Sequence, residues 1–331
     1  MDNRMNVLLT GGAGYIGSHI CNSLIDNGFK VSTIDNLSTG NVNLIPKKVE
    51  HINCDISDTK IVSSFINKNN FDVVMHLAAF TRVGESVKYP DKYRLNNFEK
   101  AKIFIDNCLN NNLKRFIFSS TGSVYGNLNN NMNIKENDPT NPINPYSQSK
   151  LDFEKYLLKQ TSKKKAYCTI LRYFNVAGAD LKKRSGLKSN PDNLIKAICE
   201  VAVKKRDKLI VNGNDYETKD GTPIRDFIHV LDLADIHILV AKSLMNLGEN
   251  EIYNCGYGKG FSIMDVIKEM NSIIGFQLPV KIGSRRKGDA VYSVADNQRF
   301  QQKFNWKPKY DNLKIILESS LEWEKTQNIH E

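Results

Sequence analysis

The sequence lacks a long hydrophobic run. No window of its 331 residues approaches the roughly 18 apolar residues in a row that a membrane-spanning helix needs. The first residues, MDNRMNVLLTGG, also lack the basic segment and apolar stretch of a secretory signal. We therefore expect a protein that has no membrane contact and resides in the cytoplasm.

Cysteine is scarce, and no two cysteines form a CxxC pair. The six residues are Cys21, Cys54, Cys108, Cys168, Cys199 and Cys255. Such wide spacing is typical of free thiols in a reducing compartment and argues against a disulfide framework. The six histidines show no HExxH spacing, so we expect no metal site.

Positive charge exceeds negative charge, but the basic residues form no recognisable nucleic-acid-binding motif. The formal net charge is +10, and the lysines are spread along the whole chain. One of the longest basic runs, Lys163–Lys165, ends a polar segment of helical spacing. We therefore expect no nucleic-acid partner, although a basic surface favours a ligand that carries phosphate groups.

The first half of the chain alternates short apolar runs with segments of helical spacing. The runs that predict strands are Asn6–Thr10, Lys30–Ile34, Val49–Asn53, Asp72–Leu77, Arg115–Ser119 and Cys168–Arg172. The segments that predict helices are Tyr15–Asn27, Asp91–Asn112 and Pro145–Lys163. This alternation predicts βαβ units and hence an α/β fold with a Rossmann-type, doubly wound parallel sheet.

The pattern changes after about Asn175, where loops lengthen and glycine and proline recur. We expect residues 1–175 to form the sheet domain, with a return segment near residues 228–256. Residues 176–331 are expected to form mainly a smaller C-terminal lobe that binds the substrate.

A glycine-rich turn, GGAGYIG at residues 11–17, joins the first predicted strand to the first predicted helix. Glycines at this spacing permit a tight turn and a close approach of the backbone to a pyrophosphate, which the helix N-terminus then binds. Asp35 follows the next strand about 20 residues on, where a carboxylate binds a ribose 2′-hydroxyl and repels a 2′-phosphate. The sequence therefore predicts NAD rather than NADP, with Asp55 and Ile56 placed to contact the adenine.

Two YxxxK matches occur, Tyr146–Lys150 and Tyr310–Lys314, and their surroundings separate them. The first follows the segment SSTGSVYG at residues 119–126, in which a predicted strand ends in hydroxyl groups. A spacing of four on a helix places Tyr146 and Lys150 on one face. A nearby ammonium and the nicotinamide charge would stabilise a tyrosinate, and a Ser or Thr hydroxyl would bind the reacting oxygen. We interpret the second match as chance.

With these motifs the chain resembles the UDP-glucose (UDP-galactose) 4-epimerases, a family of extended short-chain dehydrogenases/reductases. The resemblance covers nearly all of the sequence. Its further motifs are VGES (83–86), PYSQSK (145–150), LRYFNVAGA (171–179), GNDYETKDGTPIRDFIHVLDLAD (213–235) and RRKGDAVYSVAD (285–296). It implies that NAD oxidises the C4 hydroxyl of UDP-glucose or UDP-galactose, that the keto sugar turns over, and that the hydride returns to its other face. It also implies a homodimer formed through the helices Asp91–Asn112 and Pro145–Lys163.

The resemblance assigns a role to each matched position. Tyr146 is the base and later the acid, Thr121 polarises the C4 oxygen, and Lys150 holds the nicotinamide ribose. The cofactor-binding set that it implies is Gly11, Gly14, Tyr15, Ile16, Gly17, Asp35, Asn36, Asp55, Ile56, Ala78, Asn96, Tyr146, Lys150 and Tyr173. The substrate-binding set is Thr121, Asn175, Asn193, Leu194, Leu209, Val211, Arg225, Arg286, Asp289 and Ser293.

Ser293 stands where some members of the family carry a bulky tyrosine that faces the sugar C2 substituent. A small residue at this position implies room for an N-acetyl group. We therefore expect UDP-GlcNAc and UDP-GalNAc as further substrates.

Two alternative functions remain open at this point. Nucleotide-sugar 4,6-dehydratases and decarboxylases share NAD, the tyrosine and the lysine, but they usually carry an acidic residue directly after the catalytic Thr or Ser. Here Gly122 and Ser123 follow Thr121. A non-catalytic NAD-binding sensor is the more distant alternative; such proteins tend to lose the tyrosine or the lysine, and this chain has both.

Overall fold

The computed structural model describes residues 4–128, 132–188, 192–246, 248–286 and 288–327, and the chain divides into two compact units. Unit 1 comprises Met1–Val124, Asn144–Arg172 and Ala234–Tyr253, and unit 2 comprises Tyr125–Ile143, Tyr173–Leu233 and Asn254–Glu331. The chain thus passes between the units several times. A functional division near residue 175 stays a prediction.

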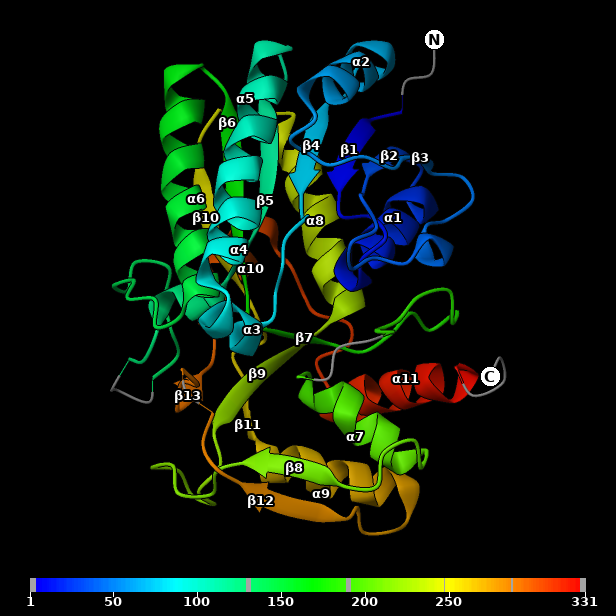
Figure 1. Cartoon of the computed structure of the whole chain (residues 1–331), viewed down its shortest axis with the longest axis vertical. Helices are drawn as coiled ribbons and strands as arrows, with labels where there is room; N and C mark the ends of the chain where they lie inside the picture. Colours follow the sequence, from blue (N-terminus) through cyan, green and yellow to red (C-terminus); the bar gives the residue numbers. More distant parts are fainter. Residues whose placement is uncertain (1–3, 129–131, 189–191, 247, 287, 328–331) are drawn as a thin grey trace. The chain divides into compact units, whose positions relative to one another are not determined.

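A sheet of parallel strands forms the centre of unit 1 (Figure 1). Within the described residues, its seven strands lie in the order β10-β6-β5-β4-β1-β2-β3. They are β1 (Asn6–Thr10), β2 (Lys30–Ile34), β3 (Glu50–Ile52), β4 (Val73–His76), β5 (Arg115–Thr121), β6 (Tyr167–Tyr173) and β10 (Glu251–Cys255). Because β1 pairs in parallel with both β2 and β4, the strand order reverses beside β1. This is the doubly wound topology that the sequence predicts, and ligands bind at such a reversal.

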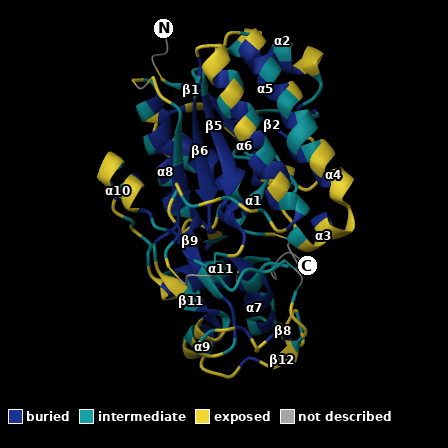
Figure 2. Ribbon diagram, turned by 90° about the vertical axis from the view of Figure 1, so that its left-hand side faces the viewer, coloured by how far each residue is buried: buried dark blue, intermediate teal, exposed yellow. Residues whose placement is uncertain are grey.

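Helices cover both faces of this sheet. Among those of unit 1 are α1 (Tyr15–Asp26), α2 (Thr59–Asn69), α3 (Val83–Lys88), α6 (Pro145–Lys163) and most of α8 (Val230–Leu244), with the short 3-10 turn η1 (Val42–Leu44). Figure 2 shows α5 (Ala101–Asn110) and α6 on one face and α8 on the other. A continuous apolar core, which includes Phe65, Phe104 and Phe153, lies under α2, α5 and α6. Strands covered on both faces need apolar residues throughout, and every residue of β1 is buried.

The single helix predicted over Asp91–Asn112 is wrong in one respect, because a π-helical turn interrupts it. The segment consists of α4 (Pro90–Arg94), the π-helical turn η2 (Leu95–Lys100) and α5. Inside η2, buried Asn97 accepts a hydrogen bond from Phe80 N (2.8 Å) and donates to Phe80 O (2.9 Å) and to Ser149 Oγ (3.3 Å). A π-helical turn is common at functional sites, and the apolar spacing of the sequence does not distinguish it from an α-helix.

Unit 2 contains a small mixed sheet, a separate pair of strands and several helices. Strand β9 (Ile224–His229) pairs antiparallel with β11 (Gly260–Ser262) and parallel with β7 (Asn175–Ala177) and β13 (Tyr292–Ser293). The separate parallel pair is β8 (Leu209–Asn212) and β12 (Val280–Gly283). Helices α7 (Leu194–Ala202), α9 (Ile263–Ile274) and α11 (Leu313–Thr326) contact one another, and α10 (Gln298–Phe304) completes the unit.

All six cysteines are buried free thiols, as their spacing indicated. Across the part of the chain that the structure describes, every helix is too short or too polar to cross a bilayer. The basic run Lys163–Lys165 is exposed at the end of α6, as expected for a solvated helix terminus.

Candidate active site

The glycine-rich turn between β1 and α1 has no space for side chains. Gly11 has a φ of +81°, and a Cβ at Gly17 would lie 2.1 Å from the Gly11 carbonyl oxygen. The N-cap residue of α1 is Gly14, so no side chain caps the helix. The first turn begins with Tyr15 and Ile16 and contains no acidic residue. The positive end of the helix dipole at this turn therefore favours an anion. This fits the pyrophosphate of a dinucleotide.

Asp35 is a buried carboxylate directly after β2. Its Oδ2 accepts from Ala13 N at 2.9 Å and its Oδ1 accepts from Leu37 N at 2.8 Å. One oxygen therefore fixes the glycine turn. Because each carboxylate oxygen can accept a second hydrogen bond, the group can still bind ribose hydroxyls. It cannot tolerate a 2′-phosphate, so it fits NAD rather than NADP.

Replacement of Asp35 by asparagine removes the charge with little change of shape. We expect Asp35→Asn to weaken NAD⁺ binding about tenfold, on the scale of one lost hydrogen bond to a charged group. Discrimination against NADP⁺ should fall at the same time, because the repulsion of the 2′-phosphate is removed. Titration calorimetry with both dinucleotides measures this, and an unchanged ratio of the two affinities would contradict the role of Asp35.

Asp55, after β3, accepts more hydrogen bonds than the sequence indicated. Its Oδ2 accepts from Lys100 Nζ (2.6 Å) and Asn36 Nδ2 (3.2 Å), and its Oδ1 accepts from the N–H and hydroxyl of Ser57. Burial raises the pKa of Asp55, but the hydrogen bonds from Lys100 and Ser57 outweigh this and lower the pKa to about 2. The carboxylate is therefore always an acceptor, which suits the amino group of adenine. Lys100, 45 residues away, lies in no motif, and our sequence analysis missed it.

Thr121, Tyr146 and Lys150 come from two adjoining elements of unit 1. Thr121 is buried at the end of β5, just before the 3-10 turn η3 (Gly122–Tyr125). Tyr146 and Lys150 lie in the first two turns of α6, where the side chain of Asn144 caps the helix by accepting from Ser147 N at 2.9 Å. The side chain of Thr121 is close enough to the Tyr146 hydroxyl to lower its pKa. The structure thus brings the predicted base and the predicted hydroxyl together.

Burial controls the protonation of this set. Burial raises the pKa of Tyr146 to about 12, and the side chain of Thr121 lowers it only in part. Burial lowers the pKa of Lys150 to about 7, against the charge of Glu154. Lys150 Nζ donates to Ser119 O at 2.8 Å. Burial therefore shifts both groups towards their neutral forms, and a positive nicotinamide would favour the tyrosinate.

The second YxxxK match does not form a comparable site. Tyr310 lies before α11, whereas Lys314 is inside that helix. The Tyr310 ring lies 4.8 Å from that of His229, and its backbone N–H donates to Asp232 at 2.9 Å. These contacts indicate that Tyr310 has a packing role.

The other predicted cofactor residues lie after β3 and β4, in η2 and at the end of β6. Ile56 is buried after β3, and Ala78 N donates to Thr10 Oγ1 at 3.2 Å. Asn96 lies in η2, where its side chain donates to Asn97 at 3.1 Å. Tyr173 is buried at the end of β6.

The residues predicted to bind the nucleotide diphosphate lie in unit 2. Ser293 and Arg225 are direct partners in the register of β13 and β9, and Asn175 is paired with Phe227 of the same strand β9. Burial lowers the pKa of Arg225, while the charge of Asp289 opposes this and Arg286 adds to it. The structure therefore gathers two arginines and one aspartate within unit 2. Leu209 and Val211 are buried on β8.

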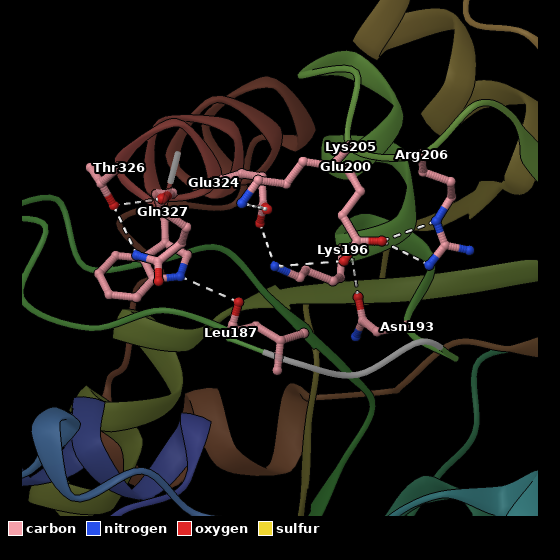
Figure 3. A network of polar contacts seen from close by, with 10 residues as sticks. Leu187, Asn193, Lys196, Glu200, Lys205, Arg206, Glu324, Thr326 and Gln327 are labelled. Atoms are coloured by element: carbon pink, nitrogen blue, oxygen red, sulfur yellow. Dashed lines mark hydrogen bonds and ion pairs between the residues drawn. The ribbon is translucent and has the colours of Figure 1, made fainter. Parts of the chain in front are cut away.

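Asn193 and Leu194 begin helix α7, which a charged network holds in place (Figure 3). Asn193 accepts from Lys196 N at 3.0 Å. The Lys196 side chain forms a buried ion pair with Glu324 of α11, and Arg206 pairs with Glu200 at 2.7 Å. The network attaches α7 to α11 and so fixes the position of Asn193. Lys196 and Glu324 are 128 residues apart, so no local pattern reveals the pair.

Comparisons with known proteins agree with this arrangement. The model of the NAD dependent epimerase/dehydratase family matches residues 7–256. The UDP-glucose 4-epimerase of Azospirillum brasilense is 41% identical over 322 residues, which cover 97% of this chain and 92% of that protein. The structure of the UDP-glucose-4-epimerase from Stenotrophomonas maltophila with bound NAD and formylated UDP-arabinopyranose has a TM-score of 0.95 and 30% identity, and the match covers 99% of this chain and 100% of that one. The UDP-Glc/GlcNAc 4-epimerase of Campylobacter jejuni has a TM-score of 0.83 and 38% identity, over 97% of this chain and 99% of that one.

Proposed function

The chain belongs to the NAD dependent epimerase/dehydratase family, and we propose that it is an NAD-dependent 4-epimerase that interconverts UDP-glucose and UDP-galactose. The observation that carries this proposal is the placement of Thr121 against the Tyr146 hydroxyl, with Lys150 one helical turn further along α6. Gly122 and Ser123 follow Thr121, so this position supplies no carboxylate for dehydration or decarboxylation. Relatives named as UDP-glucose 4-epimerases support the epimerase over these alternatives.

The residues of unit 1 move the proton and orient the reacting sugar. When bound, NAD supplies reversible hydride transfer at C4. The tyrosinate of Tyr146 takes the proton of the C4 hydroxyl, and Thr121 holds the same oxygen by a hydrogen bond. Lys150 binds the nicotinamide ribose and stabilises the tyrosinate through its charge. After the keto sugar has turned over, Tyr146 returns the proton to the new C4 oxygen.

The residues of unit 2 bind the uridine diphosphate in this proposal. Arg225 and Arg286 are suited to the diphosphate, because a guanidinium binds phosphate oxygens in bidentate fashion. Asp289 balances their charge. The remaining nucleotide contacts are assigned to Asn175, Asn193, Leu194, Leu209 and Val211.

We also propose that the protein is a cytoplasmic homodimer formed through α4, η2, α5 and α6. Leu95 and Ile103 support this surface, because 56% and 42% of these two apolar residues are exposed. A partner that covers them would remove apolar surface from water.

The reaction itself is tested by incubating the purified protein with UDP-glucose and following the products by NMR. We expect UDP-galactose to appear until equilibrium is reached. Absorbance at 340 nm should show no steady growth, because the hydride leaves and returns within one turnover. Steady growth would instead indicate a dehydrogenase, and a 6-deoxy-4-keto product would indicate a dehydratase. Tyr146→Phe serves as the inactive control.

A further inference from the structure

A buried ion pair lies one helical turn beyond Lys150. Glu154 of α6 and Arg172 of β6 are only 1% and 4% exposed. Arg172 Nε donates to Glu154 Oε1 at 3.1 Å, and a second guanidinium nitrogen donates to Oε2 at 2.7 Å. Two parallel hydrogen bonds of this kind fix the plane of the carboxylate.

Ser120 connects this pair to the catalytic strand. Its hydroxyl donates to Glu154 Oε1, and the next residue along β5 is Thr121. Glu154 follows Lys150 by four positions and Tyr146 by eight, so all three side chains share one face of α6. A single carboxylate therefore joins the helix that carries the base to the strand that carries Thr121.

Glu154 also balances charge around Lys150. The titratable groups that bear on Lys150 are Glu154 on α6, His76 on β4 and, behind Glu154, Arg172 on β6. Tyr146 lies one helical turn before Lys150 on α6. Burial lowers the pKa of His76 to about 3, so this ring is neutral. Strand β5 contributes only the backbone oxygen of Ser119 and the ring of Phe118 to Lys150. Bound NAD⁺ adds positive charge at the nicotinamide, which favours loss of the lysine proton.

We propose that Glu154, held by Arg172 and Ser120, is a positioning residue for the reaction: it fixes α6 against the end of β5 and keeps Lys150 charged when NAD⁺ is bound. This inference rests on the proposed function. Apolar side chains of similar size often replace a buried ion pair without loss of stability, so a purely structural pair would not need its charges.

The test compares the pH dependence of kcat in variants that change this charge in opposite directions. Glu154→Gln should shift the alkaline limb of the profile down by about one pH unit, the scale of a Coulomb interaction over one helical turn. Arg172→Met leaves the carboxylate unpaired and should shift that limb up. The double variant Glu154→Gln/Arg172→Met removes both charges, of which Glu154 is the nearer to Lys150, so the limb should move down by less than in Glu154→Gln alone. Ser120→Ala should lower kcat without a shift.

If the variants lose activity but the alkaline limb stays at its wild-type pH in all of them, the proposal is wrong, because a merely structural pair predicts that result. Should Glu154→Gln fail to fold, Arg172→Met and the double variant carry the same comparison. The double variant leaves neither charge of the pair uncompensated.

A second measurement needs no sugar chemistry, so it separates this proposal from the proposed function. Because the pKa of Lys150 is lowered to about 7 in the folded chain, the unfolded chain binds one more proton above that pH. The Lys150 contribution to the free energy of unfolding therefore rises with pH from about pH 7 towards the ordinary lysine range. To isolate this rise, the free energy of unfolding of each Lys150→Met derivative is subtracted from that of its parent protein at each pH. Its onset should move down in Glu154→Gln and up in Arg172→Met, and an unmoved onset would reject the charge role of Glu154.

Discussion

Tyr146→Phe is expected to lower kcat for UDP-sugar epimerisation by about a hundredfold or more, the loss typical of a missing general acid–base group. The phenyl ring remains, so the edge-on contact with the Tyr93 ring at 6.4 Å is retained. NAD and UDP-sugar should therefore still bind, and the effect should appear in kcat rather than in KM. Steady-state kinetics together with titration calorimetry separate the two.

The matched control is Tyr310→Phe, in the other YxxxK match. The described contacts of Tyr310 use its ring and its backbone N–H, both of which phenylalanine preserves. We expect kcat within about twofold of the original, as for most substitutions away from reacting groups. Equal losses at the two positions would show that Tyr146 is not the base.

The elements nearest the site could be predicted from the sequence because local signals define them. Strands β1 and β2 begin and end at the predicted residues, since runs rich in β-branched and apolar residues suit strands covered on both faces. Helix α6 spans the predicted Pro145–Lys163, because Asn144 provides the N-cap and proline favours the first helical position. The spacing of Tyr146 and Lys150 within this helix is local information of the same kind.

The supporting groups of the site could not be predicted, because their partners are distant in sequence. Lys100 meets Asp55 across 45 residues, and Glu154 meets Arg172 across 18. A charged residue in an amphipathic helix usually faces solvent, so composition alone does not mark Glu154 as buried. The π-helical turn was missed for a related reason: the inward direction of Asn97 depends on its contact with Phe80, which lies on another segment.

Ser293→Tyr is expected to suppress turnover of UDP-GlcNAc and UDP-GalNAc by ten- to a hundredfold while leaving UDP-glucose and UDP-galactose nearly unchanged. Ser293 is half-buried on β13 and is the register partner of Arg225, which we assign to the diphosphate. The neighbouring Tyr292 hydroxyl donates a hydrogen bond to Asn133 Oδ1 at 3.0 Å. This contact fixes the position of the strand at Ser293.

The physical reason is space. An acetamido group has more heavy atoms than the hydroxyl it replaces, and overpacking a filled site costs about 1–3 kcal/mol. A tyrosine at position 293 should therefore exclude the acetylated pair and tolerate the other. Ser293→Ala is the control, because it keeps the space and removes only the hydroxyl, so both pairs should react as before. The measurement is kcat/KM for all four UDP-sugars in the three proteins. If the unaltered protein ignores acetylated sugars, or if the tyrosine slows both pairs alike, Ser293 does not determine the choice of sugar.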